Sequence, residues 1–86
     1  LQHLERLRIG EETTEMLACD LVLQNDLMKI LRTAIASCEQ KQDYVTRDLL
    51  EALLHYEEDH LDWIEAQQYL ITEIGIQNYL QSQIGE

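Results

Sequence analysis

The chain has 86 residues, enough for one small domain that buries only about 60% of the surface its unfolded form exposes. It has no proline, no phenylalanine and only three glycines, and it is rich in leucine, glutamate, glutamine and isoleucine, which favours helices and argues against a sheet. Its formal net charge of −11 argues against nucleic acid or an anionic membrane surface as a partner and favours cations or basic proteins.

No apolar run is long enough to span a bilayer, and no basic segment precedes an apolar one as in a signal peptide. The two cysteines, Cys19 and Cys38, have neither the spacing of a zinc site nor the density of a secreted disulfide scaffold. We therefore expect buried free thiols and a cytoplasmic location. Leu1 is not a start methionine, which is compatible with a fragment, a processed product or a truncated chain.

The first predicted element is a long helix over residues 11–39. Residues 1–9 form an apolar and basic lead-in, and Gly10 is expected to break the chain before this helix. The acidic residues that follow suit the positive end of a helix that begins there. The apolar stripe of the helix repeats every seven residues, which is typical of helices packed at shallow angles. The stripe consists of Leu17, Leu21, Gln24, Met28, Leu31 and Ile35.

A second helix is predicted over residues 44–74 and a short third helix over 76–84. Asp43 is a plausible N-cap for the second helix, and Gly75 is a good C-terminal stop. Each long helix would measure about 45 Å at 1.5 Å per residue, and the two can pair as an antiparallel hairpin. The predicted fold is therefore all-α. Two helices cannot cover both of their apolar stripes, so we expect partners.

Glu57 and His60 form the most informative motif, because they lie three residues apart on an otherwise apolar stripe. The 3-4 spacing of this stripe predicts that both side chains point into the core. An ionised carboxylate without a partner is costly there, which suggests a compensating cation, and Glu-x-x-His is the metal motif of di-iron helix bundles. The alternative is a solvated pair. The stripe reads Leu50, Leu53, Glu57, His60 and Ile64, with Leu49, Leu54 and Leu61 beside it.

Several blocks of sequence, in this order and spacing, closely resemble the C-terminal half of bacterioferritin. The blocks are Ile9-Gly10-Glu11, Met16-Leu17, Asp20-Leu21, DYVTRDL at 43–49, EEDHLDW at 57–63 and NYLQSQ at 78–83. The resemblance covers the whole chain. It implies a ferritin-like four-helix subunit, of which this chain supplies the third, fourth and fifth helices. It also implies iron storage and detoxification in a hollow 24-subunit cage, with ferroxidase activity at a di-iron site and haem b between subunit pairs.

Carried over residue by residue, the resemblance makes Glu57 a bridging carboxylate and His60 a terminal ligand of the di-iron site. Gln24 falls where the family has a terminal carboxylate. An amide can offer one carbonyl oxygen to iron, but it lacks the negative charge that hard cations prefer. Two interpretations of Gln24 stand, a weakened metal ligand or a buried amide that hydrogen-bonds to its neighbours.

The resemblance assigns roles to other residues, each with a simpler alternative. Trp63 matches an aromatic residue that donates an electron, or it packs in the core or at an interface. Glu11 and Glu15 match acidic positions where a ferredoxin docks to reduce the stored iron, or they stabilise the start of a helix. Asn78 and Gln81 match residues that line a four-fold pore, or they lie on an ordinary helix surface.

The family's first two helices supply the other half of the di-iron site and the methionine that ligates haem. Neither Met16 nor Met28 lies in the matching context. The missing half is left off, cleaved or carried on another chain, or two copies pair so that each gives one Glu-x-x-His. The first functional hypothesis is an iron-oxidising storage subunit. The alternatives are a structural subunit or fragment of the cage whose site is impaired by Gln24, and a general coiled-coil adaptor.

Overall fold

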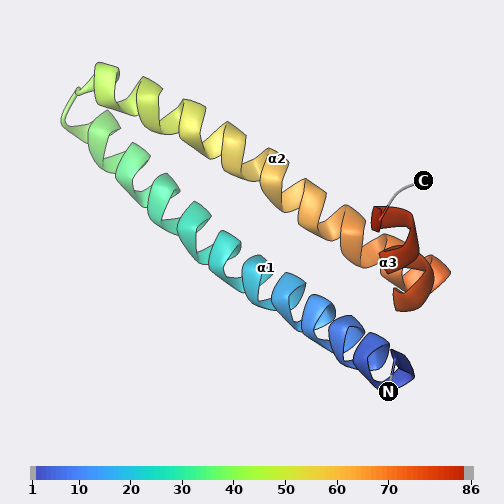
Figure 1. The fold of residues 1–86 in the computed structure, drawn as a ribbon. Helices are drawn as coiled ribbons and strands as arrows, with labels where there is room; N and C mark the ends of the chain where they lie inside the picture. The colour runs from blue at the N-terminus through green and yellow to red at the C-terminus, as the bar shows by residue number, and fades with distance from the viewer. Residues whose placement is uncertain (1, 85–86) are drawn as a thin grey trace.

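The computed structural model describes residues 2–84, which form three helices and no strand (Figure 1). α1 spans Gln2–Gln40, α2 spans Tyr44–Ile74 and α3 spans Ile76–Ile84. α1 and α2 lie side by side in opposite directions, and α3 folds across the end of this hairpin at which α1 begins. The predicted all-α fold is confirmed. The expected burial of both thiols is wrong, because Cys19 is exposed and Cys38 is half-buried. Within residues 2–84, no helix is long and apolar enough to cross a membrane.

α1 begins at Gln2, so the break expected at Gly10 is wrong. Gly10 lies inside the helix and is buried, and a Cβ atom placed on it would lie 3.1 Å from Cγ1 of Ile76 in α3. Beside it, the side-chain amide of Gln77 donates a hydrogen bond of 3.0 Å to the carbonyl oxygen of Arg6. The glycine therefore allows a close approach of α3 to α1 and does not end a helix.

The longer α1 also changes the position of Glu11 and Glu15. Both residues lie more than two turns inside the helix, and the acidic residue of its first turn is Glu5. The effect of the helix dipole falls off within the first turn. Stabilisation of a helix start is therefore the wrong explanation for Glu11 and Glu15.

A Schellman motif closes α1. The backbone N–H of Asp43 donates to the carbonyl oxygen of Cys38 at 2.9 Å, and the N–H of Gln42 donates to that of Glu39 at 3.2 Å. Gln42 has a φ of 59°, in the left-handed region that glycine adopts more readily than other residues. These backbone bonds satisfy the last carbonyls of α1 and turn the chain toward α2.

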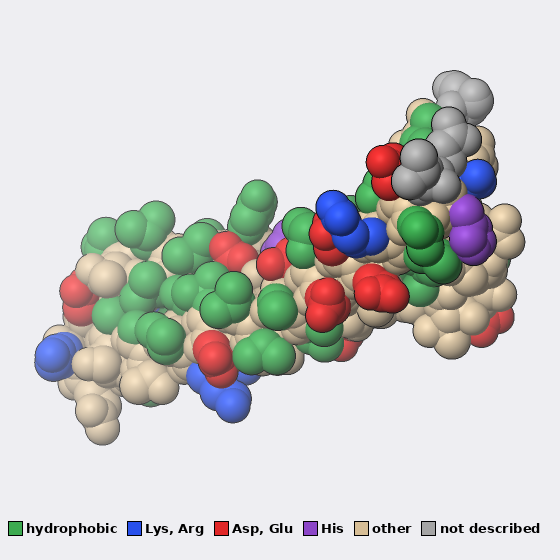
Figure 2. All heavy atoms as spheres, turned by 60° about the horizontal axis from the view of Figure 1, so that its bottom comes forward, with side chains coloured by type: hydrophobic (Ala, Val, Ile, Leu, Met, Phe, Trp, Pro, Cys, Tyr) green, Lys and Arg blue, Asp and Glu red, His purple; other side chains and the backbone are tan. Residues whose placement is uncertain are grey.

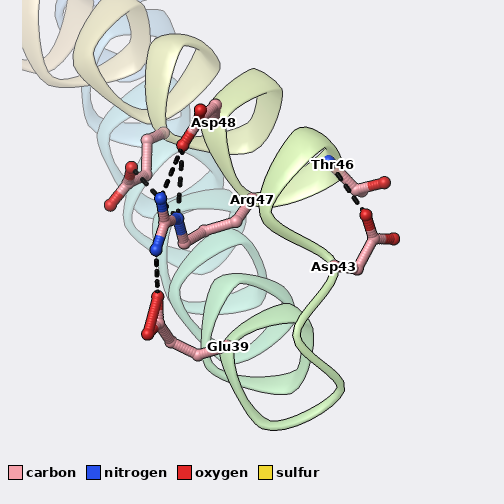
Figure 3. A network of polar contacts seen from close by, with 6 residues as sticks. Glu39, Asp43, Thr46, Arg47 and Asp48 are labelled. Atoms are coloured by element: carbon pink, nitrogen blue, oxygen red, sulfur yellow. Dashed lines mark hydrogen bonds and ion pairs between the residues drawn. The ribbon is translucent and has the colours of Figure 1, made fainter.

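Side chains fix the start of α2 (Figure 3). The Asp43 carboxylate accepts a hydrogen bond of 3.2 Å from the backbone N–H of Thr46, as expected of an N-cap. Hydrogen bonding with the side chain of Thr46, and then with its backbone N–H, lowers the pKa of Asp43, so the stability that this bonding contributes is lost as the pH falls through that lowered value. Arg47 donates to Glu39 at 2.6 Å and to Asp48 at 2.9 Å, and so ties the end of α1 to the first turn of α2.

One row of side chains from each long helix forms the contact between α1 and α2, which we call the seam. In both rows the members are alternately four and three residues apart, a 4-3 spacing that suits nearly antiparallel packing. On α1 the seam follows the predicted stripe, with buried residues in the middle and half-buried residues interspersed. These are Leu17, Leu21, Gln24, Met28, Leu31 and Ile35. On α2 only Ile64 is completely buried, and the other members are half-buried. The α2 members are Leu50, Leu54, Glu57, Leu61, Ile64, Gln68 and Ile71.

The expected places of Leu53 and His60 on the α2 seam are wrong, because both side chains are exposed. They belong to a second stripe, one position before the seam, which also follows a 4-3 spacing. A single partner helix shields a narrow strip of α2, so this second stripe stays uncovered. Its exposed members are Leu49, Leu53, Tyr56, His60, Trp63, Leu70 and Ile74.

α1 carries an equivalent exposed stripe, also one position before its seam. Because the two helices run in opposite directions, a step of one residue back along each helix leads to the same side of the hairpin. The two stripes therefore form one surface, which we call the open face. Figure 2 shows a face of the hairpin along which hydrophobic side chains gather over most of its length. The large apolar members from α1 are Ile9, Met16, Leu23, Leu27 and Ile30.

α3 is held on α2 by a buried polar contact. The hydroxyl of Tyr79 donates a hydrogen bond of 2.7 Å to the side-chain oxygen of Gln67, and both residues are buried. Gly75 ends α2 at a φ of 82°, and its N–H donates to the carbonyl oxygen of Ile71 at 2.8 Å. The left-handed backbone at Gly75 thus turns the chain so that Tyr79 reaches Gln67.

We predict that Tyr79→Phe lowers the midpoint of thermal unfolding by about 4–8 °C. The substitution keeps the ring and removes one buried hydrogen bond, worth about 1 kcal/mol. Circular dichroism measures the midpoint, and Tyr69→Phe at an exposed position is the matched control. Equal midpoints for the two variants would contradict the role of the buried hydroxyl.

We also predict that Gln42→Gly raises the free energy of unfolding by about 0.5–1 kcal/mol, because glycine adopts the left-handed conformation with little strain. Urea unfolding measures the change. Gln40→Gly, in the last helical position of α1, is expected to have the opposite effect. A decrease of stability in both variants would show that the backbone at residue 42 is not strained.

Candidate functional site

Gln24 and Glu57 meet across the seam between α1 and α2. The Nε2 atom of Gln24 lies 2.5 Å from Oε1 of Glu57 and 3.2 Å from the backbone carbonyl oxygen of the same residue. Gln24 is buried, with 7% of its surface exposed, and Glu57 is half-buried. Gln24 is thus a buried amide that hydrogen-bonds to a neighbour, and this neighbour is Glu57, the predicted metal ligand.

The chemistry of this contact determines the orientation of the amide. A side-chain NH2 group has two hydrogens and no acceptor, and both of its neighbours on Glu57 are acceptors. The reverse orientation would place the carbonyl oxygen of Gln24 against two other oxygens. The amide nitrogen therefore faces Glu57, and its donor capacity is used within the hairpin.

His60 lies one turn after Glu57 but on the open face. Its ring is stacked on Trp63, with the ring centroids 6.1 Å apart and the planes within 6° of parallel. Trp63 is 51% exposed, so it does not pack in the core of this hairpin. The Glu-x-x-His motif is thus divided between two surfaces, with the carboxylate in the seam and the imidazole on the open face.

Within residues 2–84, no group of three or more histidine, cysteine, aspartate or glutamate side chains is placed to hold a metal ion. Glu57 and His60 offer a carboxylate and an imidazole, which suit iron and similar cations. Gln24 does not fit a metal in the same way, because its amide hydrogens point at the carboxylate. Any metal bound by Glu57 and His60 would need further ligands from a partner on the open face.

The other predicted site residues lie near α3. Glu11 and Glu15 are exposed and border a shallow hollow of about 370 Å³ between α1 and the start of α3. Asn78 and Gln81 are exposed and line a neighbouring groove of about 490 Å³. The side-chain amide of Asn78 also donates 2.8 Å to the carbonyl oxygen of Ile74, at the end of α2.

Two polar residues with structural importance were not identified from the sequence. Gln67 falls on the stripe of the open face, yet it is buried because it bonds to Tyr79 in α3. Arg47 joins acidic groups from both long helices. The sequence around each position does not indicate this role, because each contact is made with a residue from another helix or from across the turn.

Comparisons with known proteins agree on one family. A family model described as a ferritin-like domain matches residues 1–74. The bacterial ferritin of Synechocystis sp. is 47% identical over 85 residues, which are 98% of this chain and 54% of that protein. The bacterial ferritin of Pseudomonas aeruginosa is 49% identical over 76 residues, or 87% of this chain and 49% of that protein.

The bacterioferritin of Rhodobacter capsulatus is 39% identical over 79 residues, which are 92% of this chain and 49% of that protein. The chain therefore spans about half the length of the curated relatives it matches. These matches favour a helical bundle over the general coiled-coil adaptor.

Trp63 is the only tryptophan of the chain, and its contact with His60 makes it a local reporter of metal binding. We predict that cobalt(II), a paramagnetic ion that imidazole binds well, quenches the fluorescence of Trp63. His60→Ala should abolish most of this quenching, whereas His55→Ala, at an exposed position of the same helix, should not. Equal quenching in the two variants would exclude His60 as the ligand.

Proposed function

The chain belongs to the ferritin-like domain family, and on this premise we propose that it is part of an iron-storage protein, to which it supplies half of a four-helix bundle and two iron ligands. The observation that carries the proposal is the position of Glu57 and His60. The carboxylate is half-buried at the seam, and the imidazole lies next to it on the open face. A partner that covers the open face would enclose both groups.

The open face supports the first part of the proposal. Exposed apolar side chains with 4-3 spacing extend along both long helices. Such a continuous apolar surface marks an interaction site, and its spacing suits other helices packed at shallow angles. A second helix pair would complete a four-helix bundle, and the open face, including His60 and Trp63, would then line its interior.

The chemistry of the two side chains supports the second part. Ferrous iron is the substrate, and the Glu57 carboxylate and the neutral His60 ring provide an oxygen and a nitrogen ligand of the kinds that iron takes in helix bundles. Binding of both ligands from one turn of α2 fixes their spacing. The covering helices would supply the remaining ligands, so strong binding depends on the complete bundle.

Family membership alone supports the finer parts of the proposal. These are oxidation of Fe(II) by oxygen or peroxide at a di-iron site, storage of the ferric mineral in a 24-subunit cage, and haem b held by a methionine outside this chain. Docking of a ferredoxin at Glu11 and Glu15, and a pore lined by Asn78 and Gln81, agree with the exposure of these residues. Trp63 would serve as an electron donor beside His60 or as a packing residue. A cytoplasmic location completes the proposal.

A second candidate function is a shell subunit that stores iron without oxidising it. The hydrogen bond between Gln24 and Glu57 favours this candidate, because it engages the carboxylate that would bind iron. The chain would then contribute the hairpin and its interfaces to the cage, and another subunit would supply the oxidation.

The test of the proposal is iron loading of the native assembly. We expect the purified assembly to take up ferrous iron under air and to retain it as a ferric mineral. Glu57→Ala and His60→Ala should slow the initial uptake by about tenfold or more, since loss of groups near a metal costs 10- to 100-fold in affinity or activity. Iron is measured per subunit by absorbance and elemental analysis.

Glu58→Ala and His55→Ala are matched controls on the same helix, where the two side chains pair with each other at the surface. Their uptake should equal that of the unmodified chain. If the assembly retains iron and the Glu57 and His60 substitutions do not change the uptake, the result would support the second candidate, the shell subunit. An assembly without iron, of the same mass, would reject iron storage.

A further inference from the structure

We infer that Gln24 takes the place of a cation beside Glu57. Its amide hydrogen-bonds to the carboxylate, so the seam between α1 and α2 needs no metal ion. The residue at position 24 therefore decides whether Glu57 favours a metal ion. The inference concerns the specificity of the proposed site. It rests on the proposed function for the assignment of Glu57 as an iron ligand.

The first step is the environment of the carboxylate. Glu57 is half-buried between two helices, where an ionised group needs a partner. Salt bridges in the described part of the chain involve other acidic residues, and the contact that reaches Glu57 is the amide of Gln24 at 2.5 Å. A neutral donor therefore stabilises the carboxylate by hydrogen bonding in the position where a cation would neutralise it.

The second step is the geometry of the donor. Nε2 of Gln24 contacts both the carboxylate and the main-chain carbonyl oxygen of Glu57, at 2.5 and 3.2 Å. With 7% of its surface exposed, Gln24 has little access to water as an alternative partner. Both donor hydrogens are thus directed to one residue, and the contact holds α1 and α2 in a single register at this point.

The third step follows from a change of one group. In Gln24→Glu, an NH2 group is replaced by an oxygen, and two carboxylates face each other in a half-buried seam. Neither carboxylate can donate to the other when both are ionised, so the contact becomes repulsive. A divalent cation with a preference for oxygen ligands would remove the repulsion by binding both.

The experiment measures thermal unfolding of the full chain, in the assembly that it forms, with EDTA and with manganese(II) chloride. The unmodified chain should respond to manganese much less than Gln24→Glu does, because the amide of Gln24 already pairs with Glu57. Gln24→Glu should unfold about 5–15 °C lower in EDTA and regain most of this difference with manganese. Asn25→Asp is the matched control, because it adds the same charge to the neighbouring exposed position of α1.

A reciprocal exchange isolates the hydrogen bond from the charge. Gln24→Glu combined with Glu57→Gln has the net charge of the unmodified chain and again pairs one amide with one carboxylate. This double variant should unfold close to the unmodified chain in EDTA and should not respond to manganese. If Gln24→Glu fails to fold, Gln24→Met provides the comparison, with a lower midpoint that manganese does not raise.

A rise of the unmodified chain with manganese as large as that of Gln24→Glu would overturn the inference. Equal unfolding midpoints of Gln24→Glu and Asn25→Asp in EDTA would also overturn it. The same holds for equal unfolding midpoints of Gln24→Met and the unmodified chain. Iron content, as measured for His60→Ala, tests the proposed function separately. An assembly that stores no iron but unfolds as described would remove the function and leave the role of Gln24 intact.

Discussion

The packing of α1 against α2 along one seam is the constraint on which the rest of the structure depends. Two helices in contact shield one strip of each other, and both helices carry a second apolar strip beside it. Among the described residues, five apolar side chains are buried, one of them contributed by α3. Burial of this extent does not offset the conformational entropy of so long a hairpin. The open face is therefore the surface through which the hairpin must gain most of its stability.

Polar groups in the interior make this packing specific. Gln24 bonds to Glu57 between the two long helices, and Gln67 bonds to Tyr79 between α2 and α3. Within residues 2–84, no buried side-chain nitrogen or oxygen atom is left without a hydrogen-bond partner. A shift of one helix along the other would break these bonds at a cost of about 1–3 kcal/mol for each unsatisfied group. Apolar contacts alone would not fix the register as strictly, because they are non-directional.

The same polar contact connects stability with chemistry. In a metal site, a carboxylate at this depth is neutralised by the ion, and removal of the ion leaves repulsion between ligands. In this chain the amide of Gln24 already satisfies Glu57. On the proposed assignment of Glu57 as an iron ligand, the hairpin therefore has a reduced need for the metal. His60, on the open face, depends on the partner for its surroundings.

Local signals in the sequence were sufficient for much of the fold. Asp43 and Gly75 mark the ends of α2 because N-capping and left-handed backbone are properties of single residues. The stripe of α1 could also be predicted, since its members recur every four and three residues along the helix. The role of Gly10 could not be predicted. In the sequence, a glycine buried inside a helix cannot be told from one that ends a helix, and the difference depends on the contact with Ile76.

The sequence by itself determined an all-α hairpin, the seam of α1 and the presence of a Glu-x-x-His motif, because these follow from helical periodicity and capping. Only the tertiary structure decided which of two adjacent stripes of α2 faces α1. Both stripes are apolar with the same 4-3 spacing, so the pattern places Glu57 and His60 together. The choice depends on the partner helix, whose Gln24 meets Glu57 and leaves His60 on the open face.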